Sequence, residues 1–350
     1  MTAPRLSVCI ATLNRATFLG EMLDSLISQV TAGGFDSQVE VVVIDGASTD
    51  DTEQVLRDRQ ARFAHLRYRR LEAKGGVDLD YCRAVEMAEG EYCWLMSDDD
   101  LLKPGAVAAV LEASQNSYSL IVVNAEVRDA DLSTVLHPTC LPFTTDQVYP
   151  SAEHARLLTD LANYMSFIGS VVIRREVWNA RQTEPYLGTE FIHLGVIFQS
   201  ALPAATRVLA AAHIIIRYGN ASWSGRSFET WLFKWPQLIW SFTDLPAAAK
   251  AQVTPEEPWR NPRFLLIYRA KGVLTPEIYQ RWLAPRMIRV GERLSAWFAA
   301  HLPGCVINAM VMAYFSLVRP QFKTLQADMR ASPYYFRRCL SRLRKPTINA

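Results

Sequence analysis

The first hundred residues alternate short apolar runs with segments whose apolar side chains recur at helical spacing. The runs 6–11 and 39–44 are rich in β-branched residues, and each is followed by small or polar residues that break it. Between them, the segment 18–27 places its large apolar residues on one face of a helix. This alternation predicts an α/β fold with a parallel sheet and right-handed crossovers. In such sheets, ligands bind at the carboxyl ends of the strands.

The strongest chemical signal at such a strand end lies in residues 92–104. There an apolar run passes through Ser97 into three consecutive carboxylates, Asp98, Asp99 and Asp100. Concentrated negative charge beside a buried strand costs stability unless a cation or water neutralises it. Oxygen ligands of this kind suit Mg²⁺ or Mn²⁺, particularly when a substrate diphosphate supplies further ligands. The alternative is a solvated acidic turn.

Four short motifs in residues 6–105, taken in their order and spacing, resemble the nucleotide-binding half of glycosyltransferase family 2. They are Ala11-Thr12-Leu13-Asn14-Arg15, the segment 43–52, Gly90-Glu91-Tyr92, and Asp98-Asp99-Asp100 with Pro104. The aspartates after residues 94–97 are similar to those of the abequosyltransferase-like subgroup, which transfers dideoxy sugars in O-antigen assembly. The resemblance implies a GT-A fold with a mixed, mostly parallel sheet, and a hexosyl- or dideoxyhexosyltransferase activity.

The resemblance also implies roles in a donor site. Thr12 and Asp45 would contact the nucleobase, Asp98 would reach the ribose, and Asp99 or Asp100 would hold a Mn²⁺ or Mg²⁺ that bridges the diphosphate. Such an ion offsets the charge that builds on the leaving nucleoside diphosphate. For Asp45, a simpler alternative is a capping role at the entry to a helix.

Further donor-binding residues are expected in the adjoining loops, at Asn14, Arg15 and Gly76. Ser97 stands where family members often carry an aspartate, so the resemblance leaves the metal ligand open among the three aspartates that follow.

The acceptor half is expected in residues 106–226. Many family members carry a Glu-Asp pair at the place of Glu190, and this chain lacks the second member of the pair. In an inverting transferase a carboxylate there deprotonates the acceptor hydroxyl, so Glu190 is the expected catalytic base. His193 lies one helical turn on and could act as base or positioning group. Alternatively, Glu190 caps a helix and His193 is a partly buried structural histidine.

The end of the catalytic region offers two candidate ligands of the diphosphate. Arg217 and Arg226 qualify because guanidinium groups pair well with phosphate oxygens, and Trp223 could stack on a sugar or a base. Each of the three could equally be a surface or packing residue. The Gln-x-x-Arg-Trp signature of processive synthases is absent, which favours one sugar per binding event.

Residues 227–350 turn helical and aromatic. The apolar run 305–318 is shorter than the roughly 20 residues that span a bilayer, and Pro303 cuts it short. With the basic segment 336–345 nearby, it predicts a peripheral contact with the inner face of the cytoplasmic membrane. A buried core helix is the alternative.

The six cysteines lack paired spacing, and three lie in apolar or periodic stretches. This favours reduced thiols and a cytoplasmic protein, as does a start that leaves no room for a signal peptide.

The sequence thus predicts a GT-A catalytic domain over 1–226, with 1–105 binding the nucleotide sugar, and a helical region over 227–350. The expected partners are a nucleotide-sugar donor and a glycan or polyprenyl-linked oligosaccharide acceptor, in O-antigen or surface polysaccharide synthesis. A net charge of only +2 gives no signal for nucleic acid.

Two other functions are compatible with parts of the pattern. A nucleotidyltransferase would carry a Gly-rich, Lys- or Arg-bearing phosphate loop after the first strand, and residues 12–15 form no such loop. A non-catalytic carbohydrate- or nucleotide-sugar-binding protein with the same fold is the second alternative.

Overall fold

The computed structural model describes residues 3–219 and 224–336. The chain forms two compact units: the first comprises the described residues up to Tyr218 together with Leu238–Thr254, and the second comprises the rest. The first unit therefore includes a helical segment beyond residue 226, and a catalytic domain ending at that residue stays a prediction. Trp223 and the basic residues 337–345 lie outside the described residues.

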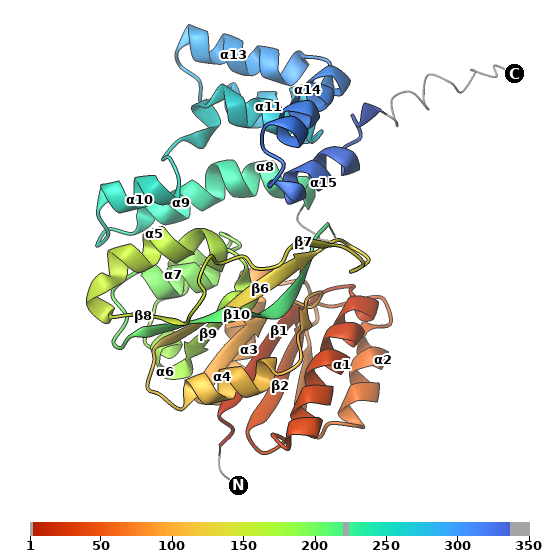
Figure 1. Cartoon of the computed structure of the whole chain (residues 1–350), viewed down its shortest axis with the longest axis vertical. Helices are drawn as coiled ribbons and strands as arrows, with labels where there is room; N and C mark the ends of the chain where they lie inside the picture. Colours follow the sequence, from red (N-terminus) through yellow and green to blue (C-terminus); the bar gives the residue numbers. More distant parts are fainter. Residues whose placement is uncertain (1–2, 220–223, 337–350) are drawn as a thin grey trace, which may run out of the picture. The chain divides into compact units, whose positions relative to one another are not determined.

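A mixed sheet forms the centre of the first unit (Figure 1). Its strands follow the order β3-β2-β1-β4-β9-β6-β10-β5, with β7 paired to β6 and β8 to β10. The first four strands run parallel, as predicted, and so do β6 and β10, whereas β9 is antiparallel to both of its neighbours. The strands are β1 (Leu6–Thr12), β2 (Val39–Asp45), β3 (Leu66–Arg70), β4 (Tyr92–Met96), β5 (Leu101–Leu102), β6 (Leu120–Arg128), β7 (Val135–His137), β8 (Gln147–Tyr149), β9 (Val171–Arg174) and β10 (Thr206–Arg217).

Helices of varied length connect these strands and form the second unit. Those that precede the second unit are α1 (Ala16–Gly33), α2 (Thr52–Gln60), α3 (Val77–Met87), α4 (Ala106–Ser114), α5 (His154–Met165), α6 (Arg175–Asn179) and α7 (Ile192–Phe198). They are followed by α8 (Ser227–Glu229), α9 (Trp235–Ser241), α10 (Ala247–Val253), α11 (Pro262–Ala270), α12 (Pro276–Ile278), α13 (Val290–His301), α14 (Gly304–Leu317) and α15 (Lys323–Ala331). Short 3-10 or π turns lie at Ser151–Glu153, Ile168–Ser170, Glu184–Tyr186, Ser224–Arg226, Thr230–Lys234, Pro258–Arg260 and Tyr279–Leu283.

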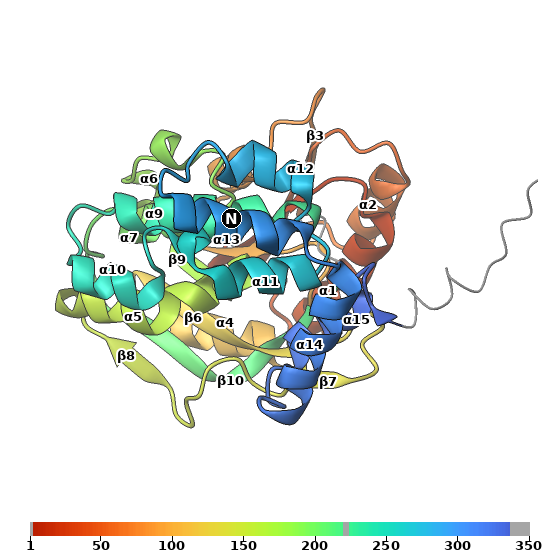
Figure 2. The ribbon, with the colours of Figure 1, turned by 90° about the horizontal axis from the view of Figure 1, so that it is seen from above.

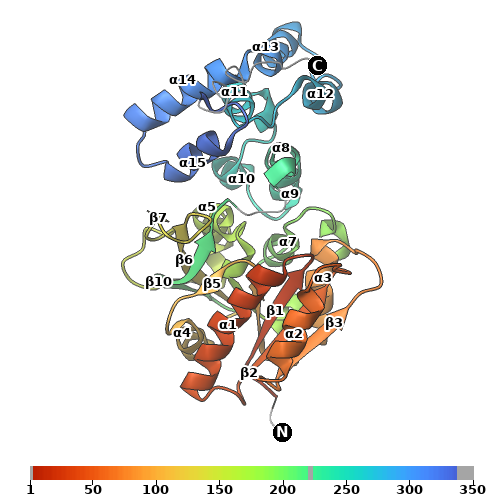
Figure 3. The same cartoon turned by 90° about the vertical axis from the view of Figure 1, so that its right-hand side faces the viewer.

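The order of the strands reverses beside β1. The chain passes from β1 through α1 to β2 and through α2 to β3, then returns through α3 to β4 on the other side of β1. Figure 3 shows α1 and α2 beside these parallel strands. Because parallel crossovers are right-handed, the reversal puts α1 and α2 on one face of the sheet and α3 on the other. The carboxyl ends of β1 and β4 therefore meet at the switch point, where ligands of such sheets usually bind.

The core beneath this switch point is built from alternate strand residues and one helix face. Leu6, Val8 and Ile10 of β1 share a fully buried cluster with Leu23 and Leu26 of α1. Strand side chains alternate between the two faces of a sheet, whereas helix residues three or four apart share one face. These two periods, both visible in the sequence, fix the orientation of β1 and α1 and so place the loop that joins them.

The second unit is a helical assembly with aromatic cores. Helix α11 packs against α13 and α14, and α15 packs against α14 (Figure 2). One core contains Phe228, Trp259 and Tyr268, in agreement with the predicted helical and aromatic character. Within the described residues, no single helix has the length and apolarity needed to cross a membrane. Helices α13 and α14 reach that length and apolarity only when they are taken together, and the pair is bent by 95° at its junction.

The cysteines follow the prediction in the first unit and depart from it in the second. Cys9, Cys82, Cys93 and Cys140 are free thiols. Cys305 is disulfide-bonded, so the prediction of a reduced thiol is wrong for this residue. Spacing along the chain could not reveal it, because a disulfide depends on proximity in the folded molecule.

Replacement of Leu23 by alanine tests the core under the switch point. We expect Leu23→Ala to lower the free energy of unfolding by about 2–5 kcal/mol, because the cavity left by a buried leucine refills only partly. Denaturant unfolding of the whole chain measures this change. Val148, which is half-exposed, supplies the control, since Val148→Ala should shift stability by about 0.5 kcal/mol or less. Equal effects of the two substitutions would contradict this account.

Candidate active site

A polar cluster joins the ends of β1 and β4. Thr12, the last residue of β1, donates a hydrogen bond from Oγ1 to Oδ2 of Asp98 over 2.8 Å. Arg15, in the loop after β1, donates from Nε to Oδ1 of Asp98 at 3.3 Å and pairs through Nη2 with Asp99. The two strands are paired in parallel register, so side chains from distant parts of the sequence meet at the switch point.

The carboxylates of this cluster are crowded. Burial and the charge of Asp99 raise the pKa of Asp98 to about 6, although Arg15 and Thr12 act to lower it. The Arg15 guanidinium also lies over the Phe18 ring, 4.5 Å from its centroid, which holds its position. Two carboxylates share one guanidinium here, so a further cation would stabilise their charged forms.

Asp100 makes different contacts from its two neighbours. Its side chain is buried and accepts a hydrogen bond from the backbone N–H of Arg217 at 3.0 Å. Burial and the charge of Asp99 raise the pKa of Asp100 well above its ordinary range. The Arg217 side chain pairs with Glu21 and donates to the carbonyl oxygen of Asp99 at 3.2 Å. Arg217 was expected to contact the diphosphate. In the structure, its position at the end of β10 lets it hydrogen-bond the aspartate turn.

Asp45 and Asn14 order the two loops beside the cluster. Asp45 is fully buried at the end of β2 and accepts from the Ser48 N–H at 2.8 Å and the Tyr68 hydroxyl at 3.0 Å. Asn14 has a left-handed φ of 55°, and its Oδ1 accepts from the Thr49 N–H at 2.7 Å. Asp45 thus orders the loop between β2 and α2, whereas the Thr52 N–H at the start of α2 donates to Asp50. A carboxylate accepts up to about four hydrogen bonds, so a nucleobase contact remains compatible with Asp45.

The donor set for a divalent ion is limited to part of the aspartate turn. Among residues 3–219 and 224–336, no three His, Cys, Asp or Glu side chains are arranged to hold a metal. Magnesium, however, commonly takes one or two protein carboxylates and completes its shell with water and substrate phosphates. Asp99, whose side chain keeps 13% of its surface exposed, and the adjoining Asp98 fit that pattern. Asp100 fits it less well, since it is enclosed against the Arg217 amide.

Glu190 lies in a strained turn that a buried carboxylate holds. Its φ of 70° is a conformation that costs a non-glycine residue about 1–3 kcal/mol, and such strain gathers at functional sites. The Glu190 N–H donates to Oδ2 of Asp78 at 2.9 Å, and the Ile192 N–H donates to Oδ1 at 3.2 Å. Burial raises the pKa of Asp78, against the lowering effect of these two bonds. The start of α3 thus fixes the backbone of the expected base.

Sequence reasoning missed the carboxylates at the start of α3. Gly76, the predicted donor residue here, precedes the helix with a φ of 101° that favours glycine. Asp78 and Asp80 follow it, and both are buried. Asp80 pairs with Arg83 at 3.0 Å. Its Oδ2 also lies close to Gly46, since a Cβ added to that glycine would be only 3.3 Å from this oxygen. The available signal was an Asp-x-Asp pair directly after a glycine loop at a strand-to-helix turn.

The contacts of His193 lie outside this cluster. His193 is buried in α7, where Nε2 is 2.8 Å from the Met165 carbonyl oxygen, and therefore carries the proton. Its Nδ1 has no hydrogen-bond partner among the described residues. Burial lowers the pKa of His193 to about 4, which favours the structural alternative for this residue. Arg226 belongs to the second unit, and its part in donor binding stays a prediction.

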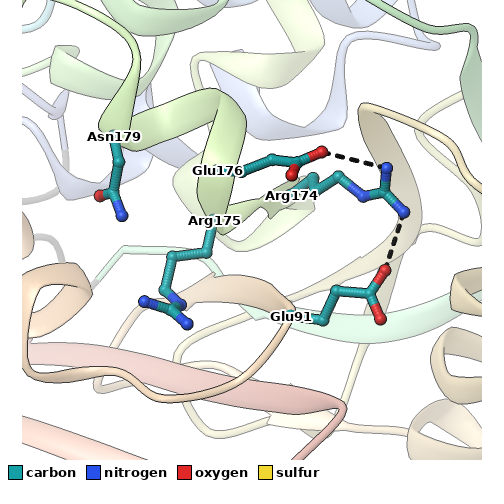
Figure 4. Close-up of a pocket in the computed structure, with 5 residues that line it drawn as sticks. All are labelled: Glu91, Arg174, Arg175, Glu176 and Asn179. Atoms are coloured by element: carbon teal, nitrogen blue, oxygen red, sulfur yellow. Dashed lines mark hydrogen bonds and ion pairs between the residues drawn. The ribbon is translucent and has the colours of Figure 1, made fainter.

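A cavity of about 320 Å³ lies elsewhere in the first unit, at the amino end of β4 (Figure 4). Its lining includes Glu91, Arg174 and Glu176, which are paired with one another: Arg174 lies 2.8 Å from Glu91 and 3.1 Å from Glu176. Asp98 follows the opposite end of the same strand. The cavity is therefore separate from the switch-point cluster. Its lining also includes Arg175, so its two acidic and two basic side chains balance.

Residues 7–178 match the model of glycosyl transferase family 2. Abequosyltransferase RfbV of Salmonella typhimurium is 26% identical over 202 residues, which are 55% of this chain and 60% of that protein. A GalNAc(5)-diNAcBac-PP-undecaprenol beta-1,3-glucosyltransferase of Campylobacter jejuni is 26% identical over 132 residues, 37% of this chain and 41% of its own length. The alignments thus span about 60% or less of these two relatives.

The fold has close counterparts among solved structures. The S. aureus TarS structure 1-349 with UDP has a TM-score of 0.57 at 20% identity, covering 98% of this chain and 93% of that one. A second structure of S. aureus TarS 1-349 gives a TM-score of 0.55 at 19% identity, covering 93% of this chain and 91% of that one. The predicted GT-A fold is confirmed. The match over residues 7–178 confirms the resemblance to glycosyltransferase family 2 that the motifs indicated, and an abequosyltransferase is among the relatives.

The pH dependence of stability tests the burial of His193. Between pH 6.5 and about 4 the unfolded chain protonates this ring and the folded chain does not, so its contribution to stability is complete above pH 6.5 and is lost as the pH falls towards 4. His193→Gln keeps a donor for the Met165 carbonyl and cannot titrate. We expect its Tm to fall less steeply over this interval than that of the wild type.

The control for this measurement is His65→Gln, since His65 is exposed. That variant should follow the wild-type profile. Parallel profiles for His193→Gln and the wild type would contradict the burial of a neutral ring.

Proposed function

We propose that the chain transfers one sugar from a nucleoside-diphosphate donor to a glycan acceptor, with the donor bound at the switch point between β1 and β4. The observation that carries this proposal is the cluster of Thr12, Arg15, Asp98 and Asp99, where oxygen ligands and a guanidinium converge at strand ends. Such a cluster offers acceptors for ribose hydroxyls and ligands for a diphosphate-bound cation.

The nucleobase is proposed to lie beside Asp45. The buried carboxylate is held by Ser48 and Tyr68, and burial together with the charge of Asp45 raises the pKa of Tyr68, which keeps that hydroxyl a donor. A fixed carboxylate of this kind can accept from a pyrimidine N–H or a cytosine amino group. Asn14 and Gly76 would shape the backbone around the donor, since both adopt left-handed or extended conformations that open the loops.

A divalent ion, Mn²⁺ or Mg²⁺, is proposed at Asp99 with Asp98 beside it. Bound there, it would neutralise charge on the leaving diphosphate. Arg15 would then be shared between the carboxylates and the phosphate oxygens, while Arg217 keeps the aspartate turn in place through its bonds to Asp99 and Glu21. Burial and the charge of Asp99 raise the pKa of Asp98, and this supports the proposal because a cation would offset the repulsion from Asp99.

Glu190 is proposed as the base that deprotonates the acceptor hydroxyl, which implies inversion at the anomeric carbon. Asp78 would serve as a positioning residue, since it accepts the N–H groups of Glu190 and Ile192. His193 stays outside this proposal because its ring is enclosed and neutral.

The acceptor is proposed to be a lipid-linked oligosaccharide of O-antigen or another surface polysaccharide, used at the cytoplasmic face of the membrane. The similarity to the Salmonella abequosyltransferase and to the Campylobacter GalNAc(5)-diNAcBac-PP-undecaprenol beta-1,3-glucosyltransferase supports this choice. A dideoxyhexose or hexose is accordingly the proposed donor sugar.

A thermal-shift panel tests the donor site. We expect one of the UDP-, GDP-, CDP- or dTDP-sugars to raise the Tm of the wild type in the presence of Mn²⁺, and EDTA to cancel the shift. Asp99→Asn should weaken the Mn²⁺-dependent affinity for that donor by about tenfold or more, because the ion loses a charged ligand. The control is Asp131→Asn in the exposed turn after β6. The absence of a shift with every donor would refute the donor-site assignment.

Glu190→Gln tests the base. We expect transfer to fall by about 10²-fold or more while donor binding in the thermal-shift assay stays unchanged, because only proton transfer is removed. Glu184→Gln, at an exposed position six residues earlier, is the matched control and should retain transfer. Undiminished turnover by Glu190→Gln would remove this residue from the mechanism.

A further inference from the structure

Helix α13 presents its large apolar side chains outward and its small ones inward. The buried residues of this helix are Ala296, Ala299 and Ala300. Exposed on it are Val290, Leu294, Trp297 and Phe298, at the spacing of a single helical face. A helix that merely covers a soluble core does the reverse, since burying the larger side chains yields more hydrophobic stabilisation.

Helix α14 is apolar on its exposed side as well as on its buried side. Its buried residues are Gly304, Ile307 and Asn308. Val306, Met310, Tyr314 and Leu317 recur along one face and are exposed. The fourteen residues of this helix contain no charged side chain at all, so nothing on the exposed face compensates for the apolar surface.

The exposed apolar residues are concentrated in one part of the chain. Among the described residues, only Val77, Val135, Val148 and Leu187 are large, apolar and exposed outside residues 288–336. Ile288, in the turn before α13, is 88% exposed, and Leu317 at the end of α14 is 82% exposed. Exposed apolar side chains gathered on consecutive helices in this way mark an interaction site in soluble proteins. We call the outward residues of 288–298 and 306–318 the apolar face.

Positive charge borders the apolar face. Arg286, Arg289 and Arg293 are exposed around the start of α13, and Arg319 follows α14. The neighbouring acid, Glu292, is paired with Arg260 and lies 3.8 Å from Arg289. Further along, the sequence 337–345 contains Arg337, Arg338, Arg342, Arg344 and Lys345 and no acidic residue. Apolar side chains bordered by arginines match an anionic lipid surface better than an uncharged partner.

The length and bend of the two helices suit a position in the membrane interface. A helix of 14 residues is about 21 Å long, short of the roughly 30 Å hydrocarbon core. The 95° bend at the junction with α13 prevents the pair from acting as one rod. Trp297 lies in the middle of the exposed face of α13, and tryptophan is enriched at the membrane–water boundary.

We propose that the apolar face of α13 and α14 docks the chain onto the surface of an anionic bilayer, with the apolar side chains entering the headgroup boundary and the arginines contacting lipid phosphates. Docking in this way requires no transferase activity. Only its link to a lipid-borne acceptor rests on the proposed function.

Vesicle sedimentation of the whole chain tests the docking. We expect the wild type to partition onto vesicles of phosphatidylcholine with phosphatidylglycerol, and much less onto phosphatidylcholine alone. Leu294→Glu and Met310→Glu, one on each helix, should each weaken partitioning by about tenfold or more, since each removes a buried apolar side chain from the complex. Arg289→Glu with Arg293→Glu should reduce the dependence on phosphatidylglycerol. All four positions are exposed, so an unchanged Tm should accompany each loss.

The matched control is Val148→Glu, at an exposed apolar position of the first unit, which should bind vesicles as the wild type does. The proposal would be overturned if the wild type failed to bind anionic vesicles, or if Leu294→Glu and Met310→Glu both bound undiminished. It would also be overturned by a dimer in light scattering that these substitutions dissociate, because the apolar face would then belong to a second copy of the chain. Vesicle binding without transfer of any sugar would leave the docking intact and refute the proposed function instead.

Discussion

The structure of the first unit depends on how negative charge is held at the end of a buried strand. Asp98 and Asp99 follow β4, and their charge is offset from one side by Arg15 and Thr12 of the β1 loop. On the other side, Arg217 of β10 holds the backbone of the same turn and the carboxylate of Asp100. Three strands that are far apart in sequence are thus joined at one acidic turn. A donor diphosphate with its cation would enter a site where the attraction of Arg15 already opposes the repulsion between the carboxylates.

Buried carboxylates also hold the neighbouring loops in place. Asp45 ties the turn after β2, and Asp78 ties the strained turn at Glu190 to the start of α3. In each case an otherwise costly buried carboxyl group is compensated by backbone N–H donors, which is the condition under which such groups persist in folded proteins. The proposed donor and acceptor sites would therefore be pre-organised by short local bonds at the ends of strands and helices. The second unit differs, since its characteristic feature is apolar surface that remains exposed.

Much of the first unit could be predicted from sequence because its information is local. The apolar runs of β1 and β2, the helical period in α1 and the acidic turn after β4 each lie within a few residues, and they predicted parallel strands with Thr12, Asp45 and Asp98 at their ends. The role of Asp78 could not be recognised, because it accepts the Glu190 N–H from 112 positions away. Nor could the sequence decide between the catalytic and the structural interpretation of His193, since that depends on what packs against its helix.

Sequence alone determined the class of fold and the strand ends at which polar residues gather, because strand and helix periods and turn residues act over short distances. The tertiary structure decided which of those residues meet. It divided the three adjacent aspartates between two environments, Asp98 and Asp99 against Arg15 and Asp100 against the Arg217 amide. It also turned the apolar residues of α13 and α14 outward. Both outcomes depend on which elements pack together, and the local sequence does not reveal contacts between elements that are distant along the chain.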